Sequence, residues 1–408
     1  MNRDILHCDM NNFYASVECM LNPKLRNKPI AVCGSVEERH GIVLAKNYPA
    51  KAFGVSTGEA IWQAKQKCKD LVVVNPHYEE YIKYSKYARE IYSRYTDLIE
   101  PFGMDECWLD ISGYSRSSYD IANEIKETIK FELGLTISIG VSFNKIFAKL
   151  GSDMKKPDAI TVIDKETFRE KIWGLPASDL LGVGRATKAK LDNYGILTIG
   201  ELANAPEHLL QSLFGKNGLL LSAYANGNDY SSVMPSGYTP PIKSVGHGVT
   251  TVRDLENLSD VYPVILELSQ DIGAKLRKYD FNAAGVAIDV RDSDLFVKQW
   301  QCHISTPTNS SAIIAEKAFD LFNNSYRWRN GIRSITVRAI NLVSANDPRQ
   351  QNFYEDFSRI ERKEKIEEAI DEIRRRFGKE AIIPASLFFN KGLTSYHAEL
   401  SMPTGLCR

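Results

Sequence analysis

Carboxylates at the ends of two short apolar segments constrain the fold of this 408-residue chain more than any other feature. Residues 4–9 read Asp-Ile-Leu-His-Cys-Asp and predict a buried strand that ends at Asp9. Residues 104–111 place Asp105 and Glu106 at a tight turn that leads into a second apolar strand. An isolated buried charge is costly, so such carboxylates must be paired, protonated or bound to metal. The fold therefore has to bring compensating groups to both segments, although they lie far apart in the sequence.

These carboxylates allow two interpretations. Taken alone, an Asp-Glu pair at a turn is more often an acidic pair exposed to solvent. Together with Asp9, however, Asp105 and Glu106 provide the hard oxygen ligands that suit magnesium. Transfer from a nucleoside triphosphate uses two cations about 4 Å apart, one activating the attacking hydroxyl and one holding the pyrophosphate. A site for two Mg²⁺ ions is therefore the second interpretation of these carboxylates, beside an acidic pair exposed to solvent.

A glycine pattern between 179 and 187 indicates contact with DNA. The run Leu-x-Gly-Val-Gly, with Gly182 and Gly184, lies between two short predicted helices and is typical of a helix-hairpin-helix element. Its glycines would let backbone N–H groups approach a phosphate at a helix N-terminus, which is binding independent of base sequence. Lys188 follows on the second helix. The alternative is a glycine-rich helical turn without DNA.

The rest of the chain predicts an α+β protein with several domains. Strands and helices mix without strict alternation as far as residue 170, and short helices fill 171–228. A segment rich in Ser, Pro and Gly (230–243) predicts a linker, and a second α+β region follows. A last helix is predicted from a capping box at Ser358 and from apolar residues at helical spacing over 366–377.

Composition leaves nucleic-acid binding open. The formal net charge is zero, whereas DNA-binding proteins are usually basic. However, a stretch from Arg327 to Arg338 carries four arginines, including Arg333, and no acidic residue. Seven scattered cysteines without a C-x-x-C pair predict reduced thiols. No apolar run is long enough for a membrane helix and the N-terminus has no signal-peptide pattern, so we expect a cytoplasmic protein.

Five motifs in order resemble those of the Y family of DNA polymerases, and most of all the bacterial polymerase IV group. The similarity runs from residue 4 through the linker and more loosely to about 345. The motifs are Asp9-Met10-Asn11-Asn12-Phe13-Tyr14-Ala15-Ser16-Val17-Glu18, Asn47-Tyr48-Pro49-Ala50-Lys51-Ala52-Phe53-Gly54-Val55, Asp105-Glu106-Cys107-Trp108-Leu109-Asp110, Gly140-Val141-Ser142-Phe143-Asn144-Lys145-Ile146-Phe147-Ala148-Lys149 and Asp153-Met154-Lys155-Lys156-Pro157.

The resemblance implies a role for each matching residue. Asp9, Asp105 and Glu106 would be the catalytic carboxylates that bind two Mg²⁺ ions, with the backbone carbonyl of Met10 completing one ion. Tyr14 would be the steric gate that lies beneath the deoxyribose and excludes ribonucleotides. Further contacts with the incoming dNTP are implied for Phe13, Tyr48, Lys51 and Lys156. Contacts with DNA are implied for Gly182, Gly184, Lys188, Arg333 and Arg338.

The resemblance also implies a right-hand architecture with a ferredoxin-like palm. The implied domains are the palm (1–11 and 77–170), small fingers (12–76), a helix-hairpin-helix thumb (171–232), a linker (233–243), an α+β little finger (244–380) and a C-terminal tail (381–408). The expected activity is low-fidelity DNA synthesis past damaged template bases, without proofreading. Primer-template DNA and dNTP are the expected partners of a monomer.

One further partner is indicated by a weak signal. Many family members carry a C-terminal peptide of the form Gln-Leu-x-Leu-Phe that binds a sliding clamp. Residues 385–389, which include Leu387 and Phe388, approximate it without the glutamine. A packing segment is the more common origin of such a run.

Two other functions stay open at this stage. A nucleotide cyclase or another metal-dependent nucleotidyl transferase would use the same carboxylates, but it needs neither a helix-hairpin-helix element nor an arginine stripe. A DNA-binding scaffold without catalysis would need neither the carboxylates nor the triphosphate residues. Primer extension with magnesium and a single dNTP separates the three.

Overall fold

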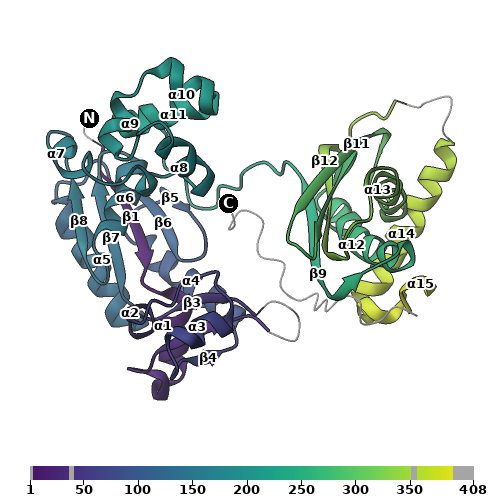
Figure 1. Ribbon diagram of the computed structural model, residues 1–408, viewed down its shortest axis with the longest axis horizontal. Coiled ribbons are helices and arrows are strands. Elements are labelled where there is room, and N and C mark those ends of the chain that lie inside the picture. The colour runs from purple at the N-terminus through teal and green to yellow at the C-terminus, as the bar shows by residue number, and fades with distance from the viewer. Residues whose placement is uncertain (1–2, 36–40, 351–355, 389–408) are drawn as a thin grey trace. The chain divides into compact units, whose positions relative to one another are not determined.

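The computed structural model describes residues 3–35, 41–350 and 356–388 (Figure 1). The chain divides into two compact units. The first includes residues 42–240 and the second includes residues 241–350. Each unit has a sheet and a core of its own, so each is described separately.

The first unit is built on a five-stranded sheet. Across the sheet the strands are β5 (Ile99–Pro101), β6 (Glu106–Asp110), β1 (Ile5–Met10), β7 (Ile137–Ser142) and β8 (Ile160–Ile163). Neighbours are antiparallel except β7 and β8, which run parallel. The central strand, β1, is buried along its whole length. The two predicted carboxylate segments, β1 and β6, are therefore direct neighbours in the sheet.

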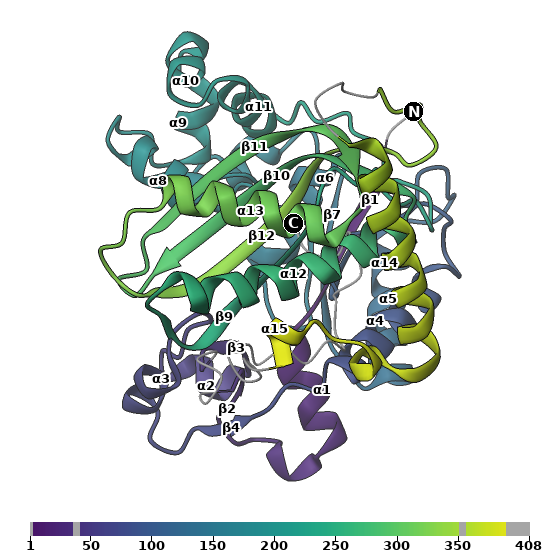
Figure 2. The same cartoon turned by 90° about the vertical axis from the view of Figure 1, so that its right-hand side faces the viewer.

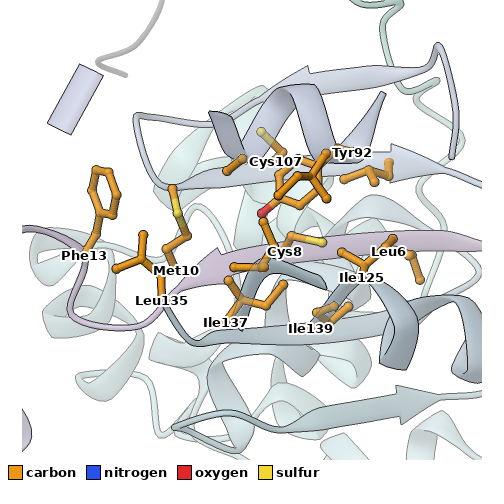
Figure 3. Packing of buried hydrophobic residues seen from close by; sticks show 14 of the residues in the cluster. Leu6, Cys8, Met10, Phe13, Tyr92, Cys107, Ile125, Leu135, Ile137 and Ile139 are labelled. Carbon is orange, nitrogen blue, oxygen red and sulfur yellow. The ribbon is translucent and has the colours of Figure 1, made fainter. Parts of the chain in front are cut away.

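Helices cover both faces of this sheet. On one face Leu6 and Cys8 of β1 pack with α4 (Tyr78–Tyr92) and α5 (Ser118–Leu133) in the main core (Figure 3). On the other face Ile5 packs against Ala148 of α6 (Lys145–Met154). Because side chains alternate along a strand, Asp9 belongs to the same face as Ile5. The first carboxylate therefore faces α6.

A glycine allows α6 to lie this close to the sheet. A Cβ atom built on Gly140 of β7 would be 1.8 Å from the Ala148 carbonyl oxygen and 2.6 Å from the Ser152 backbone nitrogen. Both atoms belong to the helix backbone, which cannot turn aside as a side chain can. Only glycine fits at this position of the strand.

A smaller sheet follows β1 in the chain. Its strands are β3 (Val43–Lys46), β2 (Ile30–Cys33) and β4 (Val72–Val74), with β2 in the middle. The accompanying helices are α1 (Phe13–Leu21), η1 (Pro23–Leu25), α2 (Tyr48–Ala52) and α3 (Ile61–Lys67). Helix α1 contributes Phe13 and Val17 to the core of the large sheet and also contacts β2 and β3. It thus connects the two sheets.

Short helices and a 3₁₀ turn form the last part of the first unit. They are α7 (Phe168–Ile172), η2 (Ala177–Asp179), α8 (Arg185–Asp192), α9 (Ile199–Asn204), α10 (Glu207–Phe214) and α11 (Lys216–Ala225). The glycine pattern lies between η2 and α8, so the first of the two predicted helices is a single 3₁₀ turn. The core of this region also includes Phe147 and Leu150 of α6, which joins it to the large sheet.

Part of the predicted linker is fixed on the first unit. The backbone N–H of Met234 donates to Glu100 Oε2 at 3.0 Å, and the N–H of Ser236 donates to the Asp97 carbonyl at 2.7 Å. The boundary between the units lies between Pro240 and Pro241. Only the last residues of the Ser-, Pro- and Gly-rich segment therefore lie beyond the first unit.

The second unit is a four-stranded antiparallel sheet with two helices on one face (Figure 2). Across the sheet the strands are β11 (Val297–Thr308), β10 (Phe281–Asp292), β12 (Ile332–Ser344) and β9 (Val245–Leu255). Helices α12 (Leu258–Lys278) and α13 (Ser311–Ser325) share a core with the sheet. The other face of β12 carries polar side chains, among them Arg338.

The last long helix, α14 (Phe357–Phe377), lies where the sequence predicts it but begins at a different cap. Its N-cap is Asp356, whose side chain accepts from the Arg359 N–H, so Ser358 is not the cap. The apolar residues at helical spacing do not form a buried face, since Ile366 is 51% exposed and Phe377 is 73% exposed.

Polar contacts attach α14 to the second unit instead. Glu367 accepts hydrogen bonds from Ser311 N at 2.6 Å and Ala312 N at 3.0 Å, and so caps the N-terminus of α13. Arg277 of α12 binds both Glu367 and Asp371. A short 3₁₀ turn, η3 (Lys379–Ala381), and a short helix, α15 (Ala385–Phe388), follow.

Candidate active site

The side chains of Asp9 and Glu106 face each other across neighbouring strands. Asp9 on β1 is directly opposite Glu106 on β6 in the antiparallel register. Residues opposite each other in such a ladder have side chains on the same face, with Cβ atoms about 5 Å apart. Asp105 precedes β6, and its carbonyl accepts from the Met10 N–H at 3.0 Å. The structure thus brings Asp9, Met10, Asp105 and Glu106 together.

Two lysines on the α6 side compensate part of this negative charge. Lys149 Nζ lies 2.6 Å from Glu106 Oε2 and 3.7 Å from Asp9 Oδ2. Lys156 Nζ lies 2.7 Å from Asp9 Oδ2, and Asp153 contacts both lysines. Of the two lysines, only Lys156 had been predicted as a site residue. Lys149 and Asp153 lie in recognised motifs and are spaced as i and i+4, but which face of α6 meets the carboxylates becomes visible only in the fold.

The carboxylates remain incompletely compensated. Burial, and after it the neighbouring Asp9 and Glu106 charges, raise the pKa of Asp105 to about 7. Burial also raises the pKa of Asp9 to about 6, despite the opposing effect of Lys156. Burial would raise the pKa of Glu106 as well, but contacts with His7 and Lys149 outweigh it and lower that pKa. Further positive charge next to Asp9 and Asp105 would therefore stabilise their ionised forms.

A buried histidine supports Glu106 from behind. His7 is fully buried, and its Nε2 lies 3.2 Å from Glu106 Oε2. Its Nδ1 lies 2.8 Å from the Ser152 hydroxyl, and its ring packs edge-on against Trp108. Burial lowers the pKa of His7 to about 4, so the imidazole is neutral at pH 7 and the contact is not an ion pair. His7 is not among the predicted site residues.

The carboxylate set fits hard divalent cations by its chemistry. As the side chains lie, no three Asp, Glu, His or Cys residues in the described part of the chain converge enough to hold an ion. The Lys149 and Lys156 ammonium groups contact Glu106 and Asp9 instead. One buried carboxylate, Asp9, and two partly buried ones, Asp105 and Glu106, nevertheless form an oxygen-rich setting with too little positive charge, which favours Mg²⁺.

The predicted triphosphate residues lie at the Asp9 side of this site. Tyr48 begins α2. Burial raises its pKa, and of the two charged groups close enough to affect it, Lys156 lowers the pKa and Asp9 raises it. Lys51 lies in the last turn of the same helix, with Nζ 5.8 Å from the Tyr48 ring centroid. Tyr48, Lys51 and Lys156 therefore lie around one edge of the carboxylate site.

Comparisons with known proteins agree with this geometry. The impB/mucB/samB family pattern matches residues 8–153, its C-terminal domain matches 242–353, and the thumb domain of DNA polymerase-iota matches 178–229. The chain is 48% identical to DNA polymerase IV of Acetivibrio thermocellus over 96% of this chain and 99% of the relative. It is 35% identical to DNA polymerase IV 1 of Bacillus subtilis, over 93% and 92% of the two chains.

A solved structure shows the same fold. A Y-family DNA polymerase chimera matches with a TM-score of 0.73 at 22% identity, over 84% of this chain and 99% of the chimera. The chain belongs to the Y family of DNA polymerases. The predicted α+β right-hand fold is thereby confirmed, and the chain is a DNA-directed DNA polymerase that resembles polymerase IV.

The predicted gate of this polymerase lies beside the carboxylates. Tyr14, on α1, is half-buried, and its hydroxyl donates to Met104 Sδ at 3.3 Å, one residue before Asp105. Phe13 is only 3% exposed and packs in the core, so its side chain cannot line a nucleotide pocket. Any contact of Phe13 with dNTP would have to come from its backbone.

The predicted DNA contacts of the first unit lie at the start of α8. Gly182 has a left-handed φ of +96°, and a Cβ there would also press on Leu221 at 3.2 Å. Gly184 is the N-cap of α8: its carbonyl accepts from the Lys188 N–H at 2.8 Å, and the helix has no side-chain cap. Lys188 Nζ lies 2.6 Å from Asp192 on the exposed face of the helix. The local geometry is that of a helix N-terminus open to a phosphate.

The predicted DNA contacts of the second unit lie on β12. Arg338 lies on the sheet face away from α12 and α13, where Asp289 of β10 contacts it at 3.2 Å. Arg333 lies where the register between β12 and β9 shifts. The Arg338 charge is thus partly neutralised within the protein, which the run of arginines in the sequence does not reveal.

The remaining predictions concern location, assembly and the clamp. None of the helices within the described ranges is long and apolar enough to cross a membrane. Cytoplasmic location and a monomeric state stay predictions. Leu387 and Phe388 lie in α15, which contacts α12, and Phe389 lies outside the described residues. Clamp binding also stays a prediction.

Proposed function

We propose that this polymerase adds nucleotides to a primer 3′-OH at Asp9, Asp105 and Glu106. These residues would hold two Mg²⁺ ions together with the Met10 carbonyl. When bound there, the ions would lower the pKa of the attacking hydroxyl and balance the charge of the departing pyrophosphate. The observation that carries the proposal is the direct opposition of Asp9 and Glu106, next to an Asp105 whose pKa is about 7.

The surrounding side chains orient the substrate in this proposal. Tyr48, Lys51 and Lys156 lie at one edge of the carboxylates and would bind the triphosphate, since ammonium and phenol groups donate to phosphate oxygens. Tyr14 would lie under the sugar and reject a 2′-hydroxyl. His7 would keep the Glu106 carboxylate in place. Its buried imidazole is neutral and so adds no positive charge that would oppose the Mg²⁺ ions.

DNA binding in this proposal is independent of base sequence. Gly182, Gly184 and Lys188 would contact backbone phosphates in the first unit, and Arg333 and Arg338 would do so in the second. Both are contacts of helix N-termini or arginines with phosphates, which position a duplex without reading it. Such binding suits a polymerase that must accept any template.

We further propose that synthesis is of low fidelity, bypasses damaged template bases and lacks proofreading. Membership of the Y family and similarity to the DNA polymerase IV relatives support this.

Primer extension tests the proposed function. The purified chain should extend a primer on an undamaged template with Mg²⁺ and dNTP, and should also insert opposite a minor-groove adduct of guanine. Mismatched primers should persist without being shortened. Extension absent on every template, with ATP converted to a cyclic nucleotide, would instead identify a nucleotide cyclase.

A further inference from the structure

Glu18 is a buried carboxylate that the proposed chemistry does not use. It is 3% exposed and lies on α1, four residues after Tyr14. Residues spaced by four in a helix project from the same face. One carboxylate oxygen, Oε1, accepts from the Tyr81 hydroxyl and lies 2.9 Å from His77 Nδ1. Glu18 therefore ties helix α1 to helix α4 directly behind the proposed gate.

Tyr81 is the residue that connects Glu18 to the gate. Its ring stacks on the Tyr14 ring at a centroid distance of 4.2 Å and an angle of 10°. Tyr81 is fully buried, and Phe13 and Tyr78 pack against its ring edge-on at 6.1 and 5.9 Å. Burial and the Glu18 carboxylate both raise the pKa of Tyr81, so its hydroxyl keeps its proton and donates it. The back of the Tyr14 ring thus has no free space.

The hydroxyl end of the Tyr14 side chain contacts the turn that carries Asp105. Its hydroxyl donates to the sulfur of Met104, the residue before Asp105. The Met104 carbonyl in turn accepts from the Ser85 hydroxyl, to which Arg89 donates at 2.6 Å. The ring is therefore held behind its face by Tyr81 and at its tip by Met104.

A steric gate discriminates only as far as it resists displacement. If the ring could move back by the width of an oxygen atom, a 2′-hydroxyl would fit at little cost. Close-packed neighbours transmit such a push instead of absorbing it, so the resistance of Tyr14 depends on what fixes Tyr81. The hydrogen bond from Tyr81 to a buried carboxylate is of the stronger, charge-assisted kind.

We propose that Glu18 and Tyr81 are positioning residues for sugar selection by this polymerase. Glu18 fixes the Tyr81 hydroxyl, Tyr81 supports the back of the Tyr14 ring, and Tyr14 excludes the ribose 2′-hydroxyl. Neither Glu18 nor Tyr81 needs to touch the nucleotide. The inference rests on the proposed function of the site and on Tyr14 as its gate.

Single-nucleotide insertion kinetics test this inference. For each variant, kcat/KM is measured for one dNTP and for the matching ribonucleotide, and their ratio is the discrimination. Tyr81→Phe keeps the stacking ring and removes one hydroxyl, and should lower discrimination about tenfold while dNTP insertion stays within a few-fold. Glu18→Ala should lower it at least as much, and Glu18→Gln should restore part of it because the amide oxygen still accepts.

Matched controls separate positioning from general loosening of the core. Tyr92→Phe removes another buried hydroxyl from α4, the helix that carries Tyr81. The Tyr92 hydroxyl makes no hydrogen bond to Glu18, so this variant should leave discrimination unchanged. Tyr14→Ala marks the discrimination that remains without a gate. Thermal melting reports whether each variant is folded. If Glu18→Ala does not fold, the discrimination of Tyr81→Phe tests the positioning role on its own.

The outcomes are distinguishable. Unchanged discrimination in folded Tyr81→Phe overturns the positioning role, and so does an equal loss in Tyr92→Phe. Unchanged discrimination in Tyr14→Ala shows instead that the gate lies elsewhere, and no dNTP insertion by the wild-type chain shows that the proposed function is wrong.

Discussion

Gly140→Ala tests whether the close packing of α6 on β7 builds the active site. The added methyl would lie 1.8 Å from the Ala148 carbonyl oxygen. To restore an ordinary contact, helix and strand would have to separate by about 1.6 Å, and overpacking of this size costs roughly 3 kcal/mol. Because α6 carries Lys149, which contacts Glu106 at 2.6 Å, the shift would also disturb the carboxylates. A misplacement of about 1 Å at reacting groups can lower the rate about a hundredfold.

Thermal unfolding and primer extension measure these two effects. We expect the melting temperature of the first unit to fall by roughly 5–10 °C and extension to fall about a hundredfold. Gly174→Ala is the matched control, since a Cβ at Gly174 meets no atom within 4 Å. If Gly140→Ala melts and extends primers like Gly174→Ala, the close approach does not govern the site and the reasoning is refuted.

The remaining predictions concern metal, charge, DNA and sugar. Asp105→Ala or Glu106→Ala should abolish primer extension and leave duplex affinity nearly intact in a binding titration, and extension within a few-fold of wild type would contradict the metal assignment. The pKa values of Asp9 and Asp105, about 6 and about 7, lie above their unfolded values, so the folded metal-free protein binds more protons and should lose stability as pH rises from 4 to 7. Melting curves in EDTA should show this slope, and Asp105→Asn should reduce it; an unchanged slope would rule out Asp105 as its source. DNA affinity should fall roughly a hundredfold between about 50 and 200 mM salt, as expected for about four phosphate contacts, and deletion of everything after Lys243 should weaken it; a flat salt titration would argue against phosphate contacts. Tyr14→Ala should raise ribonucleotide insertion by orders of magnitude with only a modest loss of dNTP insertion.

The two strands that carry the carboxylates were predictable from the sequence. Apolar runs bounded by polar turns mark β1 and β6, and the observed strands, Ile5–Met10 and Glu106–Asp110, lie within a residue or two of the expected ones. The cost of burying unpaired carboxylates predicts compensating groups beside both segments. Lys149 and Lys156 provide part of that compensation, whereas the register that places Asp9 opposite Glu106 does not follow from the two segments themselves.

The sequence predicted the existence of α14 but not how it packs. Periodic apolar residues show that a helix has an apolar face, but they do not show what covers that face. In the second unit the carboxylates of α14 bind the N–H groups at the start of α13 and the partly buried Arg277 guanidinium. The polar face therefore docks and Phe377 stays exposed.

The residues that surround the carboxylates and Tyr14 could not be predicted from the sequence for a related reason. Lys149 belongs to a helix whose orientation depends on a glycine in a different element, Gly140. Glu18 and Tyr81 belong to different helices, α1 and α4, and their contact depends on how both pack on the sheet. Local sequence patterns indicate which residues share a helix face, but not which residues of another element they meet.

Asp105 shows why an arrangement of this kind persists despite its effect on stability. Lys149 and Lys156 contact Glu106 and Asp9, while the largest charge effects on Asp105 come from other carboxylates. A carboxylate with a pKa of about 7 is half-protonated at neutral pH in the folded chain, which a structure selected for stability alone would avoid. A divalent cation would relieve this repulsion directly, since it favours the ionised form of every carboxylate it contacts. The energetic defect at Asp105 is therefore the same property that would make the site bind Mg²⁺, and Lys149 and Lys156 would limit the repulsion in its absence.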